Sequence, residues 1–339
     1  MSSPATQQPT PQLFFQTINS YQRTEALKAA IQLEVFTAIS EGNGTAPEIA
    51  KRCQTSERGM RILCDYLCII GFLAKDDQRY SLTQDSAVFL DKRSPAYLGG
   101  IIDFIVSPEI TEGFKNLAAV VRKGGTLISD EGTIAPENPV WVKFARTMVP
   151  MMAMPSQLIA RLADEKADRK LKILDIAAGH GLFGIAFAKN NPQAEIVGLD
   201  WAPVVEVAKE NARNAGVSDR CSTIEGSAFD VAYGTGYDLV LLTNFLHHFD
   251  PPTCETLLRK VHAALAEGGR AVTLEFVPNE DRISPPDAAA FSVMMLGSTP
   301  SGDAYTFSEF ERMFTNAGFA RSEIRPLPPS IEQVVISYK

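Results

Sequence analysis

The stretch LDIAAGHGLFG, residues 174–184, decides the fold, because it joins an apolar strand to a helix through a glycine-rich turn. Gly179 and Gly181 have no Cβ, so the backbone of this turn can approach a ligand closely. The first N–H groups of the following helix have no partner within the helix and point toward the same place. We therefore expect a ligand-binding turn at one edge of a sheet.

A carboxylate completes this predicted site. The next apolar run, AEIVGLD, ends at Asp200, which lies 21 residues after Gly179. An acidic residue at the end of that strand can accept hydrogen bonds from both hydroxyls of a ribose. The glycine-rich turn and the strand-end acid together predict a nucleoside-binding site.

The chain around this site alternates between strands and helices. After Lys170, the apolar runs LKILDIAAG, AEIVGLD, YDLVLLTN, GRAVTLEF and QVVISY alternate with helical segments such as VVEVAKENARNAG and ETLLRKVHAAL. This alternation predicts an α/β, Rossmann-like fold with a doubly wound parallel sheet.

The N-terminal part has a different pattern. Residues 1–12 are rich in Pro, Gln, Ser and Thr and predict a disordered tail. Apolar residues then recur every four positions, which predicts a helix that ends at the GNG of residues 42–44; they are Leu27, Ile31, Val35 and Ile39.

Two further helices and a hairpin follow. Thr45 and Glu48 form a capping-box pattern for a short helix that runs to about Arg52. A second helix runs from about Ser56, and Gly71 suits the position just after its end. FLAK and RYSLT then predict two short strands around a polar turn. This order of helices and hairpin is typical of a winged-helix module.

Composition limits the classes of function. The 339 residues are 45% hydrophobic with a net charge of −8, which predicts two domains and argues against nonspecific binding to nucleic acid or anionic membrane. Residues 1–105 contain ten basic and eleven acidic residues, so we expect the winged helix to serve dimerisation rather than DNA binding.

The chain also lacks export and membrane signals. Its first residues have no basic and apolar signal-peptide pattern, and no run approaches the ~18 apolar residues of a membrane span, so we expect a cytoplasmic protein. Five cysteines without a CxxC pair indicate reduced core thiols rather than a disulfide framework or structural zinc.

The predicted site could bind a dinucleotide such as NAD or a different nucleoside. Gly179, Gly181 and Gly184 formally match the dinucleotide fingerprint, but that match alone is weak evidence for a dinucleotide. Asp175 argues against a dinucleotide, since a carboxylate at the strand end would repel a pyrophosphate. That carboxylate suits a ligand with an ammonium and a sulfonium.

The motif set resembles class I S-adenosylmethionine-dependent methyltransferases. LDIAAGHG resembles their motif I with Ala177 in place of the first glycine, GLDW resembles motif II, GSAFD resembles the adenine-flanking segment, and YDLVLLTNFLHHF resembles motif IV. Ser227 stands where the family has an acid. The resemblance implies a seven-stranded sheet and a cofactor site formed by Asp175, Ala177, Gly179, Gly181, Asp200, Trp201, Ser227, Ala228, Phe229 and Asn244.

The domain order resembles the small-molecule O-methyltransferases of the caffeate, hydroxyindole and polyketide type, often enzymes of secondary metabolism. The resemblance implies a dimerisation domain at 13–105, connecting helices at 106–165, an S-adenosylmethionine-binding domain at 166–339, a homodimer and S-adenosylhomocysteine as product.

The resemblance also implies the acceptor chemistry. A phenol with a pKa near ~10 needs a base at neutral pH. FLHHFDPPTC resembles the segment that carries the catalytic histidine, which places the base on His247 and the carboxylate that orients it on Glu275. A second family acid falls on Ala304, with Asp303 beside it.

The acceptor pocket is expected to be apolar and to hold a planar, hydroxylated molecule. Two segments occupy positions that cover the acceptor in the family, and they supply Phe and Met side chains. His248 stands where the family often has Asp. The expected lining residues are Phe144, Met148, Met151, Met152, His248, Phe291, Met294 and Met295. We expect no metal at His247, His248 and Asp250, because adjacent side chains point in different directions. His180 is expected to pack beside the cofactor.

Three alternatives stay open at the level of sequence. The first is the same cofactor with methylation of carbon, nitrogen or sulfur, or with a reaction other than methylation. The second is a DNA-binding regulator that uses the winged helix. The third is a dehydrogenase that uses NAD.

Overall fold

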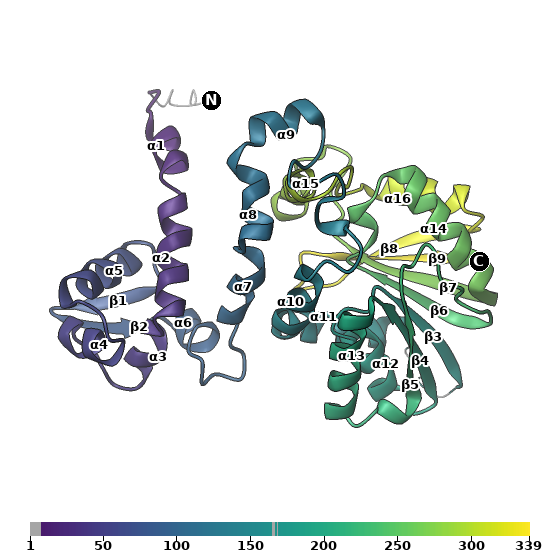
Figure 1. The fold of residues 1–339 in the computed structure, drawn as a ribbon, viewed down its shortest axis with the longest axis horizontal. Coiled ribbons are helices and arrows are strands. Elements are labelled where there is room, and N and C mark those ends of the chain that lie inside the picture. The colour runs from purple at the N-terminus through teal and green to yellow at the C-terminus, as the bar shows by residue number, and fades with distance from the viewer. Residues whose placement is uncertain (1–7, 165–166, 168) are drawn as a thin grey trace, which may run out of the picture. The chain divides into compact units, whose positions relative to one another are not determined.

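The computed structural model describes residues 8–164, 167 and 169–339 and divides the chain into two compact units, Met1–Ile102 and Asp103–Lys339 (Figure 1). The division lies three residues before the boundary expected at residue 105. Residues 1–7 of the expected tail lie outside the described residues. Gln12, expected in the tail, already begins a helix.

The first unit contains helices and one hairpin. Its elements are α1 (Gln12–Ile18), α2 (Tyr21–Gln32), α3 (Val35–Ser40), α4 (Ala46–Arg52), α5 (Glu57–Ile69), β1 (Leu73–Asp76), β2 (Arg79–Leu82), α6 (Gln84–Phe89) and η1 (Gly99–Ile101). The expected capping box of Thr45 and Glu48 is present, and Gly71, just after the end of α5, has the left-handed φ of 90° that its expected position requires. Ser56 accepts a hydrogen bond from the Gly59 N–H at the start of α5. The helix, helix, hairpin order from α4 to β2 agrees with the sequence pattern.

The helix expected to contain Leu27, Ile31, Val35 and Ile39 is in fact two helices, and that expectation was wrong. The chain breaks at Glu34, whose φ of 59° is left-handed. Ion pairs from Glu34 to Lys92 at 2.6 Å and to Arg52 at 3.2 Å hold it there. The four-residue spacing does not register such a break, because Ile31, Val35 and Ile39 are buried on both sides of it.

The second unit begins with the connecting helices. They are α7 (Ile102–Ile105), which spans the division, α8 (Pro108–Lys115), α9 (Leu117–Lys123), η2 (Gly132–Ile134), α10 (Val140–Thr147) and α11 (Val149–Ala163). The helices of the α/β part are α12 (Leu182–Asn190), α13 (Ala202–Asn214), η3 (Ser218–Arg220), η4 (Leu246–His248), α14 (Pro251–Ala264), α15 (Pro286–Ser298) and α16 (Phe307–Asn316).

A seven-stranded sheet forms the centre of this unit. Its order is β5-β4-β3-β6-β7-β9-β8, and its strands are β3 (Leu171–Ile176), β4 (Ala194–Asp200), β5 (Cys221–Glu225), β6 (Tyr237–Thr243), β7 (Leu265–Glu275), β8 (Arg321–Pro326) and β9 (Gln333–Tyr338). Strands β3 to β7 pair in parallel, whereas β9 runs antiparallel between β7 and β8. The strand order reverses between β3 and β6, where ligands bind in open α/β sheets.

Helices cover both faces of the sheet. Alternate residues of β3 and β6, such as Leu174 and Leu242, pack in one core with Leu257 of α14 and Phe314 of α16. The neighbouring residue Asp175 points to the opposite face, where it contacts the start of α12. Figure 1 shows α14 and α16 beside β8 and β9, and α12 and α13 beside β4 and β5. The helices on both faces match the predicted doubly wound arrangement, but the sheet is mixed rather than parallel throughout, because QVVISY forms the antiparallel strand β9.

The apolar runs identified five of the seven strands. The other two, β5 and β8, form the two edges of the sheet. Their residues are mostly half-buried or exposed, so CSTIE and RSEIRP lack the continuous apolar run of a central strand.

Two further expectations concern absences. No helix of the described residues combines the length and the apolar character that crossing a membrane requires. All five cysteines are free; Cys64 and Cys254 are buried, and the other three are half-buried rather than in the core.

Candidate functional site

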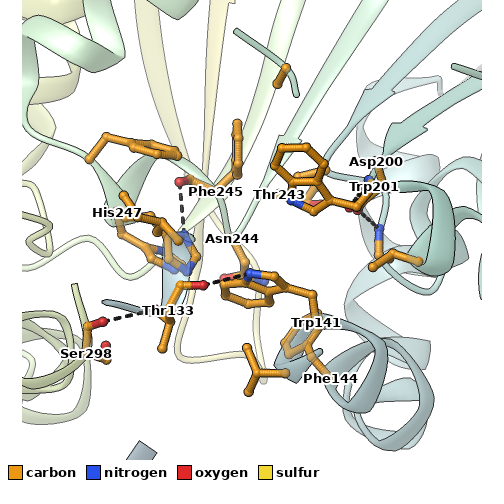
Figure 2. A pocket seen from close by; sticks show the side chains of 18 of the residues that line it. Thr133, Trp141, Phe144, Asp200, Trp201, Thr243, Asn244, Phe245, His247 and Ser298 are labelled. Atoms are coloured by element: carbon orange, nitrogen blue, oxygen red, sulfur yellow. Dashed lines mark hydrogen bonds between the residues drawn. The ribbon is translucent and has the colours of Figure 1, made fainter. Parts of the chain in front are cut away.

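A cavity of about 700 Å³ lies within the second unit, at the carboxyl end of β3, β4 and β6. Its wall contains the glycine-rich turn, the end of β4, the segment after β6, and helices α10, α11 and α15. Figure 2 shows His247 on one side of the cavity and Asp200 and Trp201 on the other, with Asn244 and Trp141 between them. The two halves of the predicted site therefore face one cavity.

The glycine-rich turn adopts the left-handed backbone that its sequence implies. Gly179 has a φ of 56°, which a residue with a Cβ rarely adopts. Ala177, in place of the family glycine, has a φ of 54°, a strain of about 1 kcal/mol or more. The third glycine has a packing role, because a Cβ on Gly184 would lie 2.6 Å from the side chain of Ile196. Helix α12 can therefore lie close to the sheet.

Asp200 joins the turn to the cavity. Its carboxylate accepts hydrogen bonds from the N–H of Gly179 at 2.8 Å and of Trp201 at 2.7 Å. A carboxylate offers about four lone-pair sites, so two backbone bonds leave capacity for a pair of ligand hydroxyls. Burial raises the pKa of Asp200 to about 6, although both backbone bonds lower it.

Asp175 has a different role from the one expected. It is fully buried and lies outside the lining of the large cavity, and its carboxylate accepts a hydrogen bond from the Gly184 N–H at 3.0 Å. Burial raises its pKa to about 7. The expected contact between Asp175 and the ligand's ammonium is therefore wrong in this geometry, because the residue holds the turn from the far side. Gly181, which begins α12, also lies outside the lining.

The other predicted cofactor residues all lie at the cavity wall; they are Ala177, Gly179, Asp200, Trp201, Ser227, Ala228, Phe229 and Asn244. The Ser227 hydroxyl accepts a hydrogen bond from the Phe229 N–H at 3.2 Å, so it shapes the loop after β5. Their contacts with the cofactor stay predictions.

His180, between the two glycines, is buried at the same wall. Its Nδ1 accepts a hydrogen bond from the Leu182 N–H, and its ring stacks on Phe144 with centroids 6.0 Å apart. Burial lowers its pKa to about 4, so the ring is neutral at pH 7. Its Nε2 is buried without a partner among the described residues.

His247 and Glu275 form a buried pair at the other side. The short helix η4 carries His247 just after β6, and Glu275 is the last residue of β7. His247 Nδ1 lies 2.5 Å from Glu275 Oε2, while Glu275 Oε1 accepts N–H bonds from Phe245, Leu246 and His247. Glu275 does not line the cavity, and its contact with His247 joins it to the wall. The pair has the geometry of an oriented base.

Electrostatics favour a neutral His247. Burial lowers the pKa of His247 to about 3. Burial raises the pKa of Glu275, and the three backbone N–H groups and the nearby His248 oppose that rise. With Glu275 as a carboxylate that accepts four N–H donors, we assign the imidazole proton of His247 to Nδ1, which makes Nε2 the nitrogen with the lone pair. Such a histidine can accept a proton.

All eight residues expected to form the acceptor pocket line the cavity; they are Phe144, Met148, Met151, Met152, His248, Phe291, Met294 and Met295. Phe291 stacks on Phe276 with ring centroids 3.9 Å apart and presents its edge to His247. The wall is therefore rich in flat and polarisable groups.

At the position of the family's second acid, no carboxylate lines the cavity. Ala304 is buried, and the Asp303 carboxylate lies 3.4 Å from Arg282 outside the cavity lining. Among the described residues, no group of His, Cys, Asp and Glu is arranged to hold a metal ion.

Two site features escaped the sequence analysis. Trp141 lines the cavity, donates its indole N–H to the Thr133 carbonyl at 2.9 Å and meets both Phe144 and His248 edge-on. Its aromatic segment was visible in the sequence, but only the fold shows which residue faces inward.

The second feature lies behind Asn244. This residue has a left-handed φ of 54° and a buried Oδ1, and Glu332 nearby is buried with its Oε1; neither oxygen has a hydrogen-bond partner among the described residues. Burial raises the pKa of Glu332 to about 7, and the hydrogen bond from the Ser330 hydroxyl opposes the rise. No motif near residue 332 signalled this acid.

Comparison with known protein families identifies the family to which the chain belongs. Residues 133–320 match the family described as the O-methyltransferase domain, and residues 15–92 match the O-methyltransferase dimerisation domain. The chain belongs to the O-methyltransferase family. This membership decides against the dehydrogenase alternative and identifies residues 15–92 of the N-terminal unit as a dimerisation domain.

Relatives and solved structures agree. A crystal structure of a candidate O-methyltransferase from Nostoc punctiforme PCC 73102 is 60% identical, with a TM-score of 0.96 over 98% of this chain and 100% of that chain. The 3-hydroxy-5-methyl-1-naphthoate 3-O-methyltransferase of Streptomyces sahachiroi is 28% identical over 89% of this chain and 87% of its own length. The structure of PigF with SAH, a protein known from Serratia, is 25% identical, with a TM-score of 0.86 over 98% of this chain and 100% of that chain.

The cofactor of this methyltransferase is S-adenosylmethionine, and the site fits it. The left-handed turn leaves room for a ligand at Gly179, and Asp200 has lone pairs for the ribose hydroxyls. The loop of Ser227, Ala228 and Phe229 lines the same cavity.

Proposed function

We propose that the protein transfers a methyl group from S-adenosylmethionine to a hydroxyl of a small aromatic or polyketide-like molecule, with His247 as the general base. The observation that carries the proposal is the buried His247–Glu275 pair, joined at 2.5 Å, on the wall of a cavity that also contains Asp200.

The chemistry divides between cofactor and protein. When bound, S-adenosylmethionine supplies a methyl group that is activated by a positively charged sulfur. The Gly179 turn and Asp200 hold one end of the cavity, so the protein can fix the direction of attack. His247 Nε2 takes the proton from the acceptor hydroxyl as oxygen attacks, and Glu275 stabilises the imidazolium that forms.

The pocket wall supports an aromatic acceptor. Trp141, Phe291 and the methionines offer flat and adaptable apolar surfaces, and methionine makes favourable contacts with aromatic rings. The Streptomyces relative is named for a hydroxynaphthoate acceptor, which is consistent with this wall.

We also propose a homodimer built on a winged-helix N-terminal unit. Helix α1 buries none of its residues, and its apolar side chains Leu13, Phe14, Phe15 and Ile18 are exposed. Such a patch on one chain is typical of an interface. A Phe14→Ser and Phe15→Ser double variant should run as a monomer in light scattering, whereas the polar control Gln16→Ser should stay dimeric. A monomeric wild type would contradict the proposal.

The function itself is tested with the purified protein, a labelled methyl donor and a panel of phenols, thiols and amines. Transfer to phenols alone is the expected result. Calorimetry with S-adenosylhomocysteine tests the cofactor end separately. Transfer only to thiols or amines, or no tight binding of S-adenosylhomocysteine, would overturn the proposal.

A further inference from the structure

The backbone of His247 is held from two sides. On one side, Glu275 Oε1 accepts three N–H bonds from the start of η4, including the one from His247 itself. On the other side, the N–H of Asp303 donates to the carbonyl oxygen of His247 at 2.9 Å. Carbonyl groups at the end of a helix have no partner within it, so a second segment supplies the partner here. The place of His247 therefore depends on residues 297–303, which we call the strap.

Gly302 brings the strap against this backbone. A Cβ at residue 302 would overlap the carbonyl oxygen of His247 and would lie 2.9 Å from the carbonyl carbon of His248. Side-chain carbons do not approach backbone atoms so closely, and a backbone carbonyl cannot turn aside as the end of a flexible side chain can. This contact between two backbone segments therefore requires a glycine.

A hydroxyl inside the strap fixes Gly302. The buried Thr299 hydroxyl accepts a hydrogen bond from the Gly302 N–H at 2.9 Å and donates to the carbonyl oxygen of Met295 at 2.8 Å. Neither Thr299 nor Gly302 lines the cavity, so both residues can affect a bound acceptor only through their neighbours.

The other end of the strap is fixed to the acceptor wall. A Cβ on Gly125 would overlap the carbonyl oxygen of Pro300, and a Cβ on Gly132 would overlap the carbonyl oxygen of Ser298. The Thr133 hydroxyl donates to the same Ser298 oxygen at 3.1 Å (Figure 2). Thr133 and Ser298 both line the cavity. A few close backbone contacts thus join this wall to the backbone of His247.

We infer that Gly302 is a positioning residue for the base, because its missing side chain lets the strap hold His247 in its place at the cavity wall. The inference rests on the proposed function, in which His247 is the general base. The strap supplies no group to the reaction. Its contribution is alignment, since a misplacement of about 1 Å can lower a rate by about 10²-fold.

The main test is Gly302→Ala, whose methyl group must push the strap and the His247 backbone apart. We expect kcat for a phenol acceptor to fall by about 10²-fold. The acceptor KM should change much less than kcat, and the affinity for S-adenosylhomocysteine should stay within about twofold, since Gly302 does not line the cavity. The matched control is Gly100→Ala, because a Cβ there would meet no described atom within 4 Å.

A second pair of variants loosens the strap without adding an atom beside His247. Thr299→Val leaves the Gly302 N–H without its acceptor and should lower kcat by about tenfold. Thr299→Ser keeps the hydroxyl and should recover most of that loss. A need for side-chain bulk alone would give the opposite order, because valine fills the space of threonine better than serine does.

The histidine rings give a readout that is independent of activity. The chain contains four histidines, so selective ¹⁵N labelling of their rings gives few signals, and those lost in His247→Ala identify His247. Gly302→Ala should shift the signal of the His247 Nδ1–H that faces Glu275. The signal of His262 on α14 should stay unchanged.

The outcomes separate the two proposals. A folded Gly302→Ala with kcat within about threefold of the wild type, or with unchanged His247 signals, would overturn the inference while the proposed function stands. A loss explained entirely by KM or by cofactor affinity would overturn it as well. Failure of the wild type to methylate any phenol would instead reject the proposed function, and the His247 signals would then decide whether the strap holds this residue. Circular dichroism verifies each fold, and the Thr299 variants decide the matter if Gly302→Ala does not fold.

Discussion

The two ends of the cavity are built in different ways. At the cofactor end, backbone from one turn is held by carboxylates, through Gly179 N–H to Asp200 and Gly184 N–H to Asp175. At the acceptor end, side chains from α10, α11, η4 and α15 meet around His247. A contiguous turn has a signature in the sequence, whereas an assembled wall does not. We therefore expect the first end to determine how the cofactor is held and the second to determine which acceptor fits.

The largest expected effect lies at the acceptor end. His247→Ala should lower kcat for a phenol acceptor by about 10²–10⁴-fold, because the proton then has no positioned acceptor. The affinity for S-adenosylhomocysteine should stay within about twofold, since His247 lies across the cavity from Asp200. Assays with labelled methyl donor measure kcat, and calorimetry measures the affinity for S-adenosylhomocysteine. The control His262→Ala should resemble the wild type, and loss of cofactor binding in His247→Ala would show that the two ends are not independent.

A smaller effect is expected at the cofactor end. Asp200→Ala should weaken S-adenosylhomocysteine binding by about 10–100-fold, because hydrogen bonds to a charged group are worth about 1.5–3 kcal/mol. The matched control is Glu225→Gln, since Glu225 pairs in register with Asp200 on the neighbouring strand but lies exposed. Calorimetry compares the three proteins. Equal affinities for wild type and Asp200→Ala would contradict the site.

The smallest expected effect is on pH dependence. Burial lowers the pKa of His247 to about 3, so its neutral form persists well below pH 6.5, the ordinary value. Activity is present above the folded-state pKa and is lost as pH falls through it. The profile of kcat/KM should therefore be flat from about pH 6.5 to pH 8 and fall only at more acidic pH. An acid limb centred above pH 6.5, with the fold intact by circular dichroism, would rule out this buried base.

The sequence predicted the fold well because central strands are continuous apolar runs. The edge strands β5 and β8 lack such a run, since solvent reaches one of their sides. The break at Glu34 was missed because ion pairs with Arg52 and Lys92, distant in sequence, support its left-handed backbone. Local periodicity carries no information about such partners.

In the candidate site too, residues with a local sequence pattern were predicted correctly, whereas residues that depend on distant partners were not. Asp200 and His247 were predicted at the cavity and lie there, since strand ends at one sheet edge meet by topology. Asp175 was predicted to contact the ligand, but strand alternation turns its side chain toward α12. Trp141 and Glu332 have no local signature, because their roles arise from contacts with residues far along the chain.

The sequence by itself determined the doubly wound fold and the glycine-rich turn with its strand-end acid, because each depends on local spacing and on the period of apolar residues. The pairing of Glu275 with His247 was implied only by the family resemblance. Only the tertiary structure decided that Asp175 contacts the start of α12 from outside the cavity lining and that His247 Nδ1 lies 2.5 Å from a buried Glu275 carboxyl oxygen at the cavity wall. The physical reason is that a side chain's direction and proton position depend on its hydrogen-bond partners, and those partners come together only when the chain folds.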